Sequence, residues 1–323
     1  MGDSNYIFAV ARIRVKERTL LSDADINQLV SMKDAAAVLA ALQDKGWGDE
    51  TCGNDPEKVL AVEEAKSLKL MKELGIEQEV FDVLGYPNLY HNLKSAVKEI
   101  CTSSDHPEAF YKEAAIDRET MLAILRDKRY DRLPDHMRKA AIETYDTMVK
   151  TMDGQMCDVI ADRACLEAME AVARHSKHKI LRDYEASTVA VTNIRIAVRA
   201  AKTGKSRQFL KAALAPSREI NTGRLAAAAA EGLDSLLTFL SSHRYAEAAE
   251  ALKVSASSFE RWCDNKLIAS IKDQKRNCMS LGPIVAYYLA RKNEIKTVRI
   301  ILTAKANGLP ETAIRERMRD MYV

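Results

Sequence analysis

Two stretches of the chain combine residue types that proteins use to hold phosphate groups. Ala201–Ser206 (AKTGKS) ends like a P-loop, in which backbone amides and a lysine surround the phosphates of a nucleotide. That loop needs a glycine where this sequence has Arg199, and it needs a strand leading into it. Gly46–Thr51 departs from the dinucleotide-binding fingerprint because Thr51 occupies the position of the third glycine. The sequence therefore predicts no nucleotide site at either stretch.

Two closely spaced histidines are the best metal-ligand candidates in the sequence. His175 and His178 would lie on one face of a helix, but four cations surround them and no Asp, Glu or Cys follows at ligand spacing. A solvated basic face is the better interpretation. The other histidines show no catalytic pattern: His91, His106, His136 and His243. Although distant residues could still converge into a catalytic site, the sequence gives no reason to propose catalytic residues, a metal or a cofactor.

The strongest physical feature is an uneven distribution of charge. The formal net charge is +3, yet Arg174–Arg218 holds eleven Lys and Arg against two carboxylates, a local charge of +9, which leaves −6 for the remainder. On a helix expected from about Ser187, three cations fall at i, i+4 and i+7 beside an apolar stripe: Arg195, Arg199 and Lys202. This edge is a candidate contact for an acidic protein, a nucleic acid or an anionic lipid surface, and an unpartnered solvated face is the alternative.

The elements that must carry these residues are helices. Glycine (12) and proline (7) are scarce among the 323 residues, whereas helix-forming residues dominate, so the sequence predicts an all-α protein. Prolines and glycines mark several helix ends. Helices are expected over 56–74, as one or two helices over 134–174, over 283–306, and from 310 onward.

Composition also indicates where the protein resides. No window approaches the roughly 18 uninterrupted apolar residues that a membrane-spanning helix needs, so no membrane-spanning segment is expected. The six cysteines form no C-x-x-C pair, which favours reduced thiols over a disulfide framework or a zinc site. We expect a cytoplasmic protein.

A recurring motif divides the chain into three parts. The triplets beginning at Asn92, Asn193 and Glu294 are separated by 101 residues each time. Each triplet lies on an expected helix that is followed by a break and a second helix, over 108–115, 207–214 and 311–321. A looser motif, a leucine followed five residues later by an aromatic residue, occurs once before each triplet: Leu42–Trp47, Leu125–Tyr130 and Leu240–Tyr245.

These repeats predict three helical units, over 1–116, 117–217 and 218–323, with the basic segment 174–218 beginning in the second. The triplet residues Asn92, Asn193 and Glu294 have two interpretations. They could hydrogen-bond neighbouring helices at equivalent places in each unit, or they could contact a partner.

Both ends of the chain resemble a known family. Tyr6–Leu21 (YIFAVARIRVKERTLL) and Pro283–Pro310 (PIVAYYLARKNEIKTVRIILTAKANGLP) are similar to the corresponding segments of the C subunit of V-type and A-type rotary ATPases, the relative of the eukaryotic d subunit. The triplets at Asn92 and Asn193 extend the resemblance through the chain.

The resemblance implies three similar all-helical domains around a pseudo-threefold axis, forming a funnel. It also implies a non-catalytic rotor component of the central stalk, a spacer that couples a shaft made of the D and F subunits to the membrane proteolipid ring during proton or sodium transport and ATP synthesis or hydrolysis. Such a protein is cytoplasmic, peripheral to the membrane, and binds no nucleic acid. The competing interpretation is a helical-repeat protein that binds nucleic acid through its basic segment.

Overall fold

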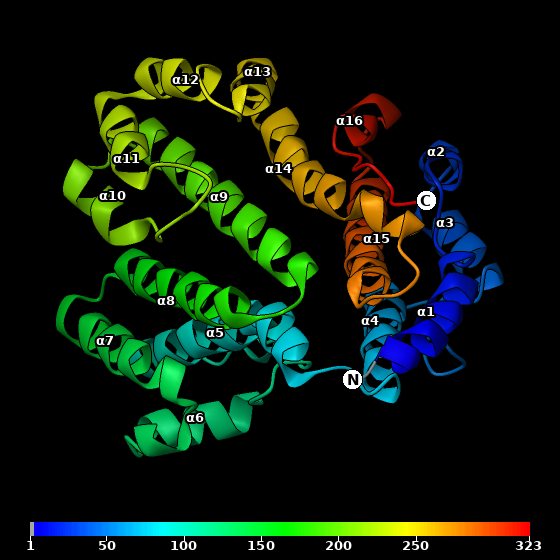
Figure 1. The fold of residues 1–323 in the computed structure, drawn as a ribbon, viewed down its shortest axis with the longest axis horizontal. Helices are drawn as coiled ribbons and strands as arrows, with labels where there is room; N and C mark the ends of the chain where they lie inside the picture. Colours follow the sequence, from blue (N-terminus) through cyan, green and yellow to red (C-terminus); the bar gives the residue numbers. More distant parts are fainter. Residues whose placement is uncertain (1–2) are drawn as a thin grey trace. The chain divides into compact units, whose positions relative to one another are not determined.

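The computed structural model describes residues 3–323, and within that range it contains α-helices and short 3-10 helices but no strand (Figure 1). The prediction of an all-α fold is confirmed. The chain forms two compact units, one made of the segments up to Glu77 and from Leu240 to Val323, and the other of Gln78–Phe239. These boundaries differ from those of the three sequence repeats. The repeats describe a motif that recurs along the chain, whereas the two units describe which segments pack together, so the three-unit division stays a prediction.

Unit 1 combines the two ends of the chain. Its helices are α1 (Asp3–Glu17), α2 (Asp23–Ser31), α3 (Ala35–Asp44), α4 (Pro56–Glu73), α13 (Ala246–Val254), α14 (Ala256–Ile271), η3 (Lys272–Arg276), α15 (Gly282–Ala306) and α16 (Glu311–Arg315). Helix α15 packs against α1, α3 and α4, so early and late segments share one apolar core. Members of that core include Val38, Leu42, Leu60, Val298 and Ile301.

Unit 2 is a continuous stretch of chain. Its helices are α5 (Gln78–Thr102), η1 (Pro107–Ala109), α6 (Arg118–Arg126), η2 (Tyr130–Arg132), α7 (Asp135–Thr151), α8 (Gly154–His175), α9 (Lys179–Lys202), α10 (Arg207–Ala213), α11 (Thr222–Glu231) and most of α12 (Leu233–Ser241). Helix α8 packs against α5, α7 and α9. The core contains Leu93, Val97, Met137, Met169 and Val189.

Several helix ends follow from the sequence. Helix α4 begins at Pro56 behind the cap Asp55, and Gly75 follows its end with a φ of +62°, a left-handed conformation that glycine adopts without a steric cost. Helix α15 ends at the expected Asn307 and Gly308. The stretch 134–174 resolves into α7 and α8, because Met152 adopts a left-handed conformation between them.

Three expected helices differ from the structure. The prediction of a helix over 108–115 is wrong, because only the short η1 forms there. The last helix, α16, stops at Arg315 rather than near Met321. Helix α9 begins at Lys179, eight residues before Ser187, because the chain turns at Ser176–His178. The first two differences share a cause, described below, in asparagines that bind the backbone of these segments.

Candidate functional site

The surface that the charge pattern predicts lies where α9 meets α10. Helix α9 ends at Lys202, Gly204 turns the chain with a φ of +62°, and the Ser206 hydroxyl accepts a hydrogen bond from the amide of Phe209 (3.1 Å), which caps α10. No carboxylate occurs between residues 186 and 218. We define the α9–α10 tip as the five cationic residues that this turn brings together: Arg199, Lys202, Lys205, Arg207 and Lys211.

The predicted trio is only partly exposed. Arg199 and Lys202 are exposed, and neither forms an ion pair within residues 3–323. Arg195 is half-buried and already interacts within the protein. Arg207 and Lys211, which are exposed on α10, belong to the predicted basic segment but were not among the predicted contact residues. The signal that could have found them is their i, i+4 spacing in a stretch without carboxylates.

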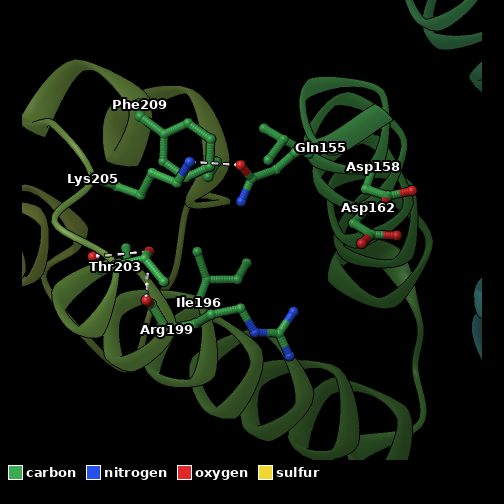
Figure 2. Close-up of a pocket in the computed structure, with 11 residues that line it drawn as sticks. Gln155, Asp158, Asp162, Ile196, Arg199, Thr203, Lys205 and Phe209 are labelled. Atoms are coloured by element: carbon green, nitrogen blue, oxygen red, sulfur yellow. Dashed lines mark hydrogen bonds between the residues drawn. The ribbon is translucent and has the colours of Figure 1, made fainter. Parts of the chain in front are cut away.

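A cavity of about 350 Å³ lies beside the tip, between α8, α9 and α10 (Figure 2). Lys205 crosses its edge, donating a hydrogen bond to the Gln155 side chain (2.6 Å) and lying over the ring of Phe209 (5.3 Å to the centroid). Arg199 lines the α9 wall, and carboxylates line the α8 wall (Figure 2).

The two carboxylates of that wall already have cationic partners. Asp158 accepts a hydrogen bond from Lys98 (2.6 Å), and Asp162 accepts one from Lys94 (2.7 Å). Both lysines come from α5. Because α5 partly neutralises these carboxylates, they do little to offset the charge of Arg199.

Three other cations of the basic segment form ion pairs within unit 2. Arg174 pairs with Glu170 and Lys179 with Asp183, each one helical turn away. Arg218 donates to buried Glu185 (2.5 Å). Burial raises the pKa of Glu185 above its usual range, although Arg218 opposes the shift. By contrast, none of the five cations of the α9–α10 tip forms an ion pair in the described part of the chain, so the tip carries uncompensated positive charge.

The two histidines do not share a helix. His175 is the last residue of α8, whereas His178 precedes α9 and lies 3.5 Å from a carboxylate oxygen of Glu79. The prediction that both lie on one helical face is wrong, because the chain turns between them. Across residues 3–323 no group of three or more His, Cys, Asp or Glu side chains is arranged to hold a metal ion.

The polar triplet residues of the first two repeats occupy equivalent positions. Asn92 on α5 donates to the carbonyl of Tyr111 and accepts from its amide, both at 2.9 Å. Asn193 on α9 makes the same pair of hydrogen bonds to Ala215, at 2.8 and 3.0 Å. Both asparagines are fully buried. Each one fixes the chain that follows its long helix, which explains why a continuous helix over 108–115 does not form.

In the third repeat the equivalent residue is Asn293, one position before the expected Glu294. Asn293 on α15 donates to the carbonyl of Asp320 (3.0 Å), which holds the chain after α16. Buried Glu294 instead accepts hydrogen bonds from the amide of Leu21 and from Arg291 (2.5 Å). Burial raises the pKa of Glu294 to about 7, although Arg291 opposes the shift.

Most of the chain is similar to one family of proteins. The family model described as ATP synthase (C/AC39) subunit matches residues 9–317. Among the helices of residues 3–323, none is long and apolar enough to cross a membrane.

Curated relatives cover nearly the full chain at low identity. The C subunit of the V-type sodium ATPase of Enterococcus hirae is 21% identical, with 96% of this chain and 97% of the relative aligned. The C subunit of the A-type ATP synthase of Methanocaldococcus jannaschii is 22% identical, over 96% of this chain and 85% of the relative. That of Halorubrum lacusprofundi is 23% identical, over 98% of each. The chain therefore belongs to the ATP synthase (C/AC39) subunit family of V-type and A-type ATPases.

Proposed function

We propose that the chain is the non-catalytic rotor component of the central stalk, a spacer between the D and F shaft and the membrane proteolipid ring. It would act on the cytoplasmic side, peripheral to the membrane. The observation that carries this proposal is the family match over residues 9–317, together with relatives named as the C subunits of a sodium ATPase and of ATP synthases. We further propose that the three repeats form three similar domains around a pseudo-threefold axis, as a funnel.

A spacer must transmit torque without bending. The three triplet-bearing helices, α5, α9 and α15, have 25, 24 and 25 residues, and a helix of that length spans about 37 Å. Their buried asparagines tie each helix to a later part of the chain. Long helices that are each anchored by a buried asparagine suit a part that passes a mechanical load between two partners.

The α9–α10 tip is the surface we assign to contact with an acidic face of the shaft or ring. Its exposed cations Arg199 and Lys202 have no ion-pair partner within the described chain. Exposed charges contribute to association mainly through complementary charge on the partner, and salt screens that contribution.

Co-purification from native membranes tests the rotor role. An affinity-tagged chain is expected to recover the D and F subunits and the proteolipid ring. Recovery as a free monomer would overturn the proposal. So would nanomolar binding to nucleic acid near physiological salt, which would favour the nucleic-acid interpretation.

A charge-reversal pair tests the role of the tip within that complex. Arg199→Glu with Lys202→Glu is expected to weaken recovery of the complex at low ionic strength, with a smaller difference from the parent at high ionic strength. The matched control is Arg126→Glu with Lys139→Glu, two exposed cations elsewhere on unit 2 that form no ion pair in the described chain. Equal recovery of parent and tip variant at low salt would refute the assignment.

A further inference from the structure

Helix α1 presents apolar side chains on two faces. Its inner face is buried in unit 1 through Tyr6, Val10 and Ile13. On the outer face, Phe8 is 68% exposed and Val15 is 66% exposed, and exposed Ala11 lies between them at helical spacing. A soluble helix normally has polar residues on its outer face. A contiguous exposed apolar face of this kind is typical of a contact surface.

A cationic cleft borders this face. It is a cavity of about 400 Å³ between α1, α4, α15 and the loop at residues 45–48. Six cations and two carboxylates line it: Arg12, Lys16, Lys45, Lys66, Lys69 and Arg291, with Glu63 and Glu73. Four of these cations already have a carboxylate partner: Arg12 with Glu73, Lys45 with Asp25, Lys66 with Glu63 and Arg291 with Glu294. Within residues 3–323, exposed Lys16 and Lys69 form no ion pair. The cleft therefore has spare positive charge to offer an acidic ligand.

The wall of the cleft is held in place by a glycine turn around Trp47. Gly46 and Gly48 have φ values of +85° and +77°, which other residues adopt only with strain. The Lys66 ammonium donates to the carbonyls of both glycines, at 3.2 and 2.6 Å. The guanidinium of Arg291 lies over the Trp47 ring, 5.4 Å from its centroid. This preorganised wall would lose little conformational entropy on binding a ligand.

The apolar face and the cleft share one edge of α1. Phe8, Arg12 and Lys16 succeed one another at i, i+4 and i+8, so they follow the same side of the helix. Arg12 and Lys16 line the cleft, whereas Phe8 begins the exposed apolar face. We propose that this surface of unit 1, which we call the α1 surface, binds an acidic amphipathic helix of another protein.

In this arrangement the partner's carboxylates enter the cleft and its apolar side chains cover Phe8 and Val15. Amphipathic helices recognise partner proteins through apolar residues at i, i+3, i+4 and i+7. The inference is independent of the rotor role, because it concerns unit 1 and an individual binding event, whereas the α9–α10 tip belongs to unit 2.

The shape of the cleft favours a helix over an anionic membrane. An amphipathic helix that binds a bilayer carries its cations where a flat surface can reach them. Here Arg291 is buried within the cleft, whereas Lys66 and Lys69 are exposed. A bilayer could reach Phe8 and Val15 but could not follow the cleft inward, whereas single carboxylate side chains can.

Fluorescence of Trp47 provides a direct test. The chain has two tryptophans, so Trp262→Phe leaves Trp47 as the only one. The probe is an 18-residue synthetic helix with Leu on one face and Glu on the other, and its control carries Lys in place of every Glu. We expect a saturable change in Trp47 emission with the acidic peptide and none with the basic one.

Variants on both halves of the surface complete the test. We expect two double variants each to weaken binding of the acidic peptide at least tenfold. One is Lys16→Glu with Lys69→Glu, and the other is Phe8→Ser with Val15→Ser. Lys33→Glu, an exposed cation of unit 1 outside the cleft, is the matched control and should bind as the parent does. Far-UV circular dichroism and the urea midpoint of each variant must match the parent, which separates lost contact from lost folding.

Three results would overturn the inference. The first is no binding of the acidic peptide, or equal binding of the basic peptide. The second is unchanged affinity in both double variants. The third is binding to phosphatidylserine vesicles but not to the peptide, which would identify the α1 surface as a membrane contact. None of these results bears on co-purification with the shaft and ring, so failure here and failure of the rotor role are distinguishable.

Discussion

Replacing Asn193 with alanine should destabilise unit 2 far more than its small change in volume suggests. The side chain is fully buried and satisfies both the amide and the carbonyl of Ala215, at 3.0 and 2.8 Å. A buried polar group left without a partner costs about 1–3 kcal/mol. Two such groups give an expected loss in the free energy of unfolding of about 3 kcal/mol or more.

Urea unfolding followed by far-UV circular dichroism measures this loss. With a slope of about 1–3 kcal/mol per molar urea, the midpoint should fall by about 1 M or more. The matched control is Gln208→Ala, which removes an exposed amide from neighbouring α10 and should change stability by less than about 0.5 kcal/mol. Hydrogen exchange of the Ala215 amide should accelerate in Asn193→Ala and not in the control.

An isosteric variant separates hydrogen bonding from packing. Asn193→Asp keeps the shape and the acceptor for the Ala215 amide, but it places a carboxylate oxygen against the Ala215 carbonyl and buries a charge. We expect a loss at neutral pH at least as large as that of the alanine variant. Part of the lost stability should be recovered at acidic pH, where the protonated carboxyl group can donate a hydrogen bond to the Ala215 carbonyl. If Asn193→Asp is as stable as the parent at neutral pH, the hydrogen bonds are not what holds this segment.

Two further predictions concern titratable groups. Burial raises the folded-state pKa of Glu294 to about 7, so the folded state binds more protons than the unfolded state between about pH 4.5 and 7, and stability should fall as pH rises through that window. Glu294→Gln should flatten this fall in urea midpoints, and an unchanged slope would contradict the assignment. Among the six cysteines only Cys278 is exposed, and burial raises the pKa of the Cys157 thiol to about 11. The native protein should therefore show one fast thiol with Ellman's reagent, absent in Cys278→Ser, and six in denaturant; a second fast thiol would refute this.

Local chemistry explains why the sequence predicts the helices well. Pro56 and Gly75 bound α4, and Asn307 with Gly308 ends α15, because these residues act through their own backbone preferences. Met152 could not be foreseen as a break. It adopts a left-handed conformation that methionine does not prefer, so its surroundings must impose that conformation.

Long-range contacts account for what the sequence could not predict. Residues 108–115 have a helical composition, but Asn92 binds the backbone of Tyr111 and competes with the helix. The cationic cleft combines residues from α1 and α4 with residues from α15, which lies more than 200 residues further along the chain. Periodicity shows which face of each helix is apolar, but it does not say which helix that face meets. The sequence largely predicts the α9–α10 tip, because all its cations lie within one short stretch of the chain.

Unit 1 is built from the two ends of the chain, and this affects the order in which the protein can fold during synthesis. Unit 2 is one uninterrupted stretch, Gln78–Phe239, and all of it is synthesised before the C-terminal part of unit 1. Helices α1–α4 cannot complete their packing until α15 is available, because α1, α3 and α4 pack against it. Nascent chains that end before α15 would expose the apolar residues of an incomplete core, and chaperones would bind the protein in that state. A circular permutant that joins the native ends and opens the chain near residue 78 would let unit 1 emerge as a single stretch.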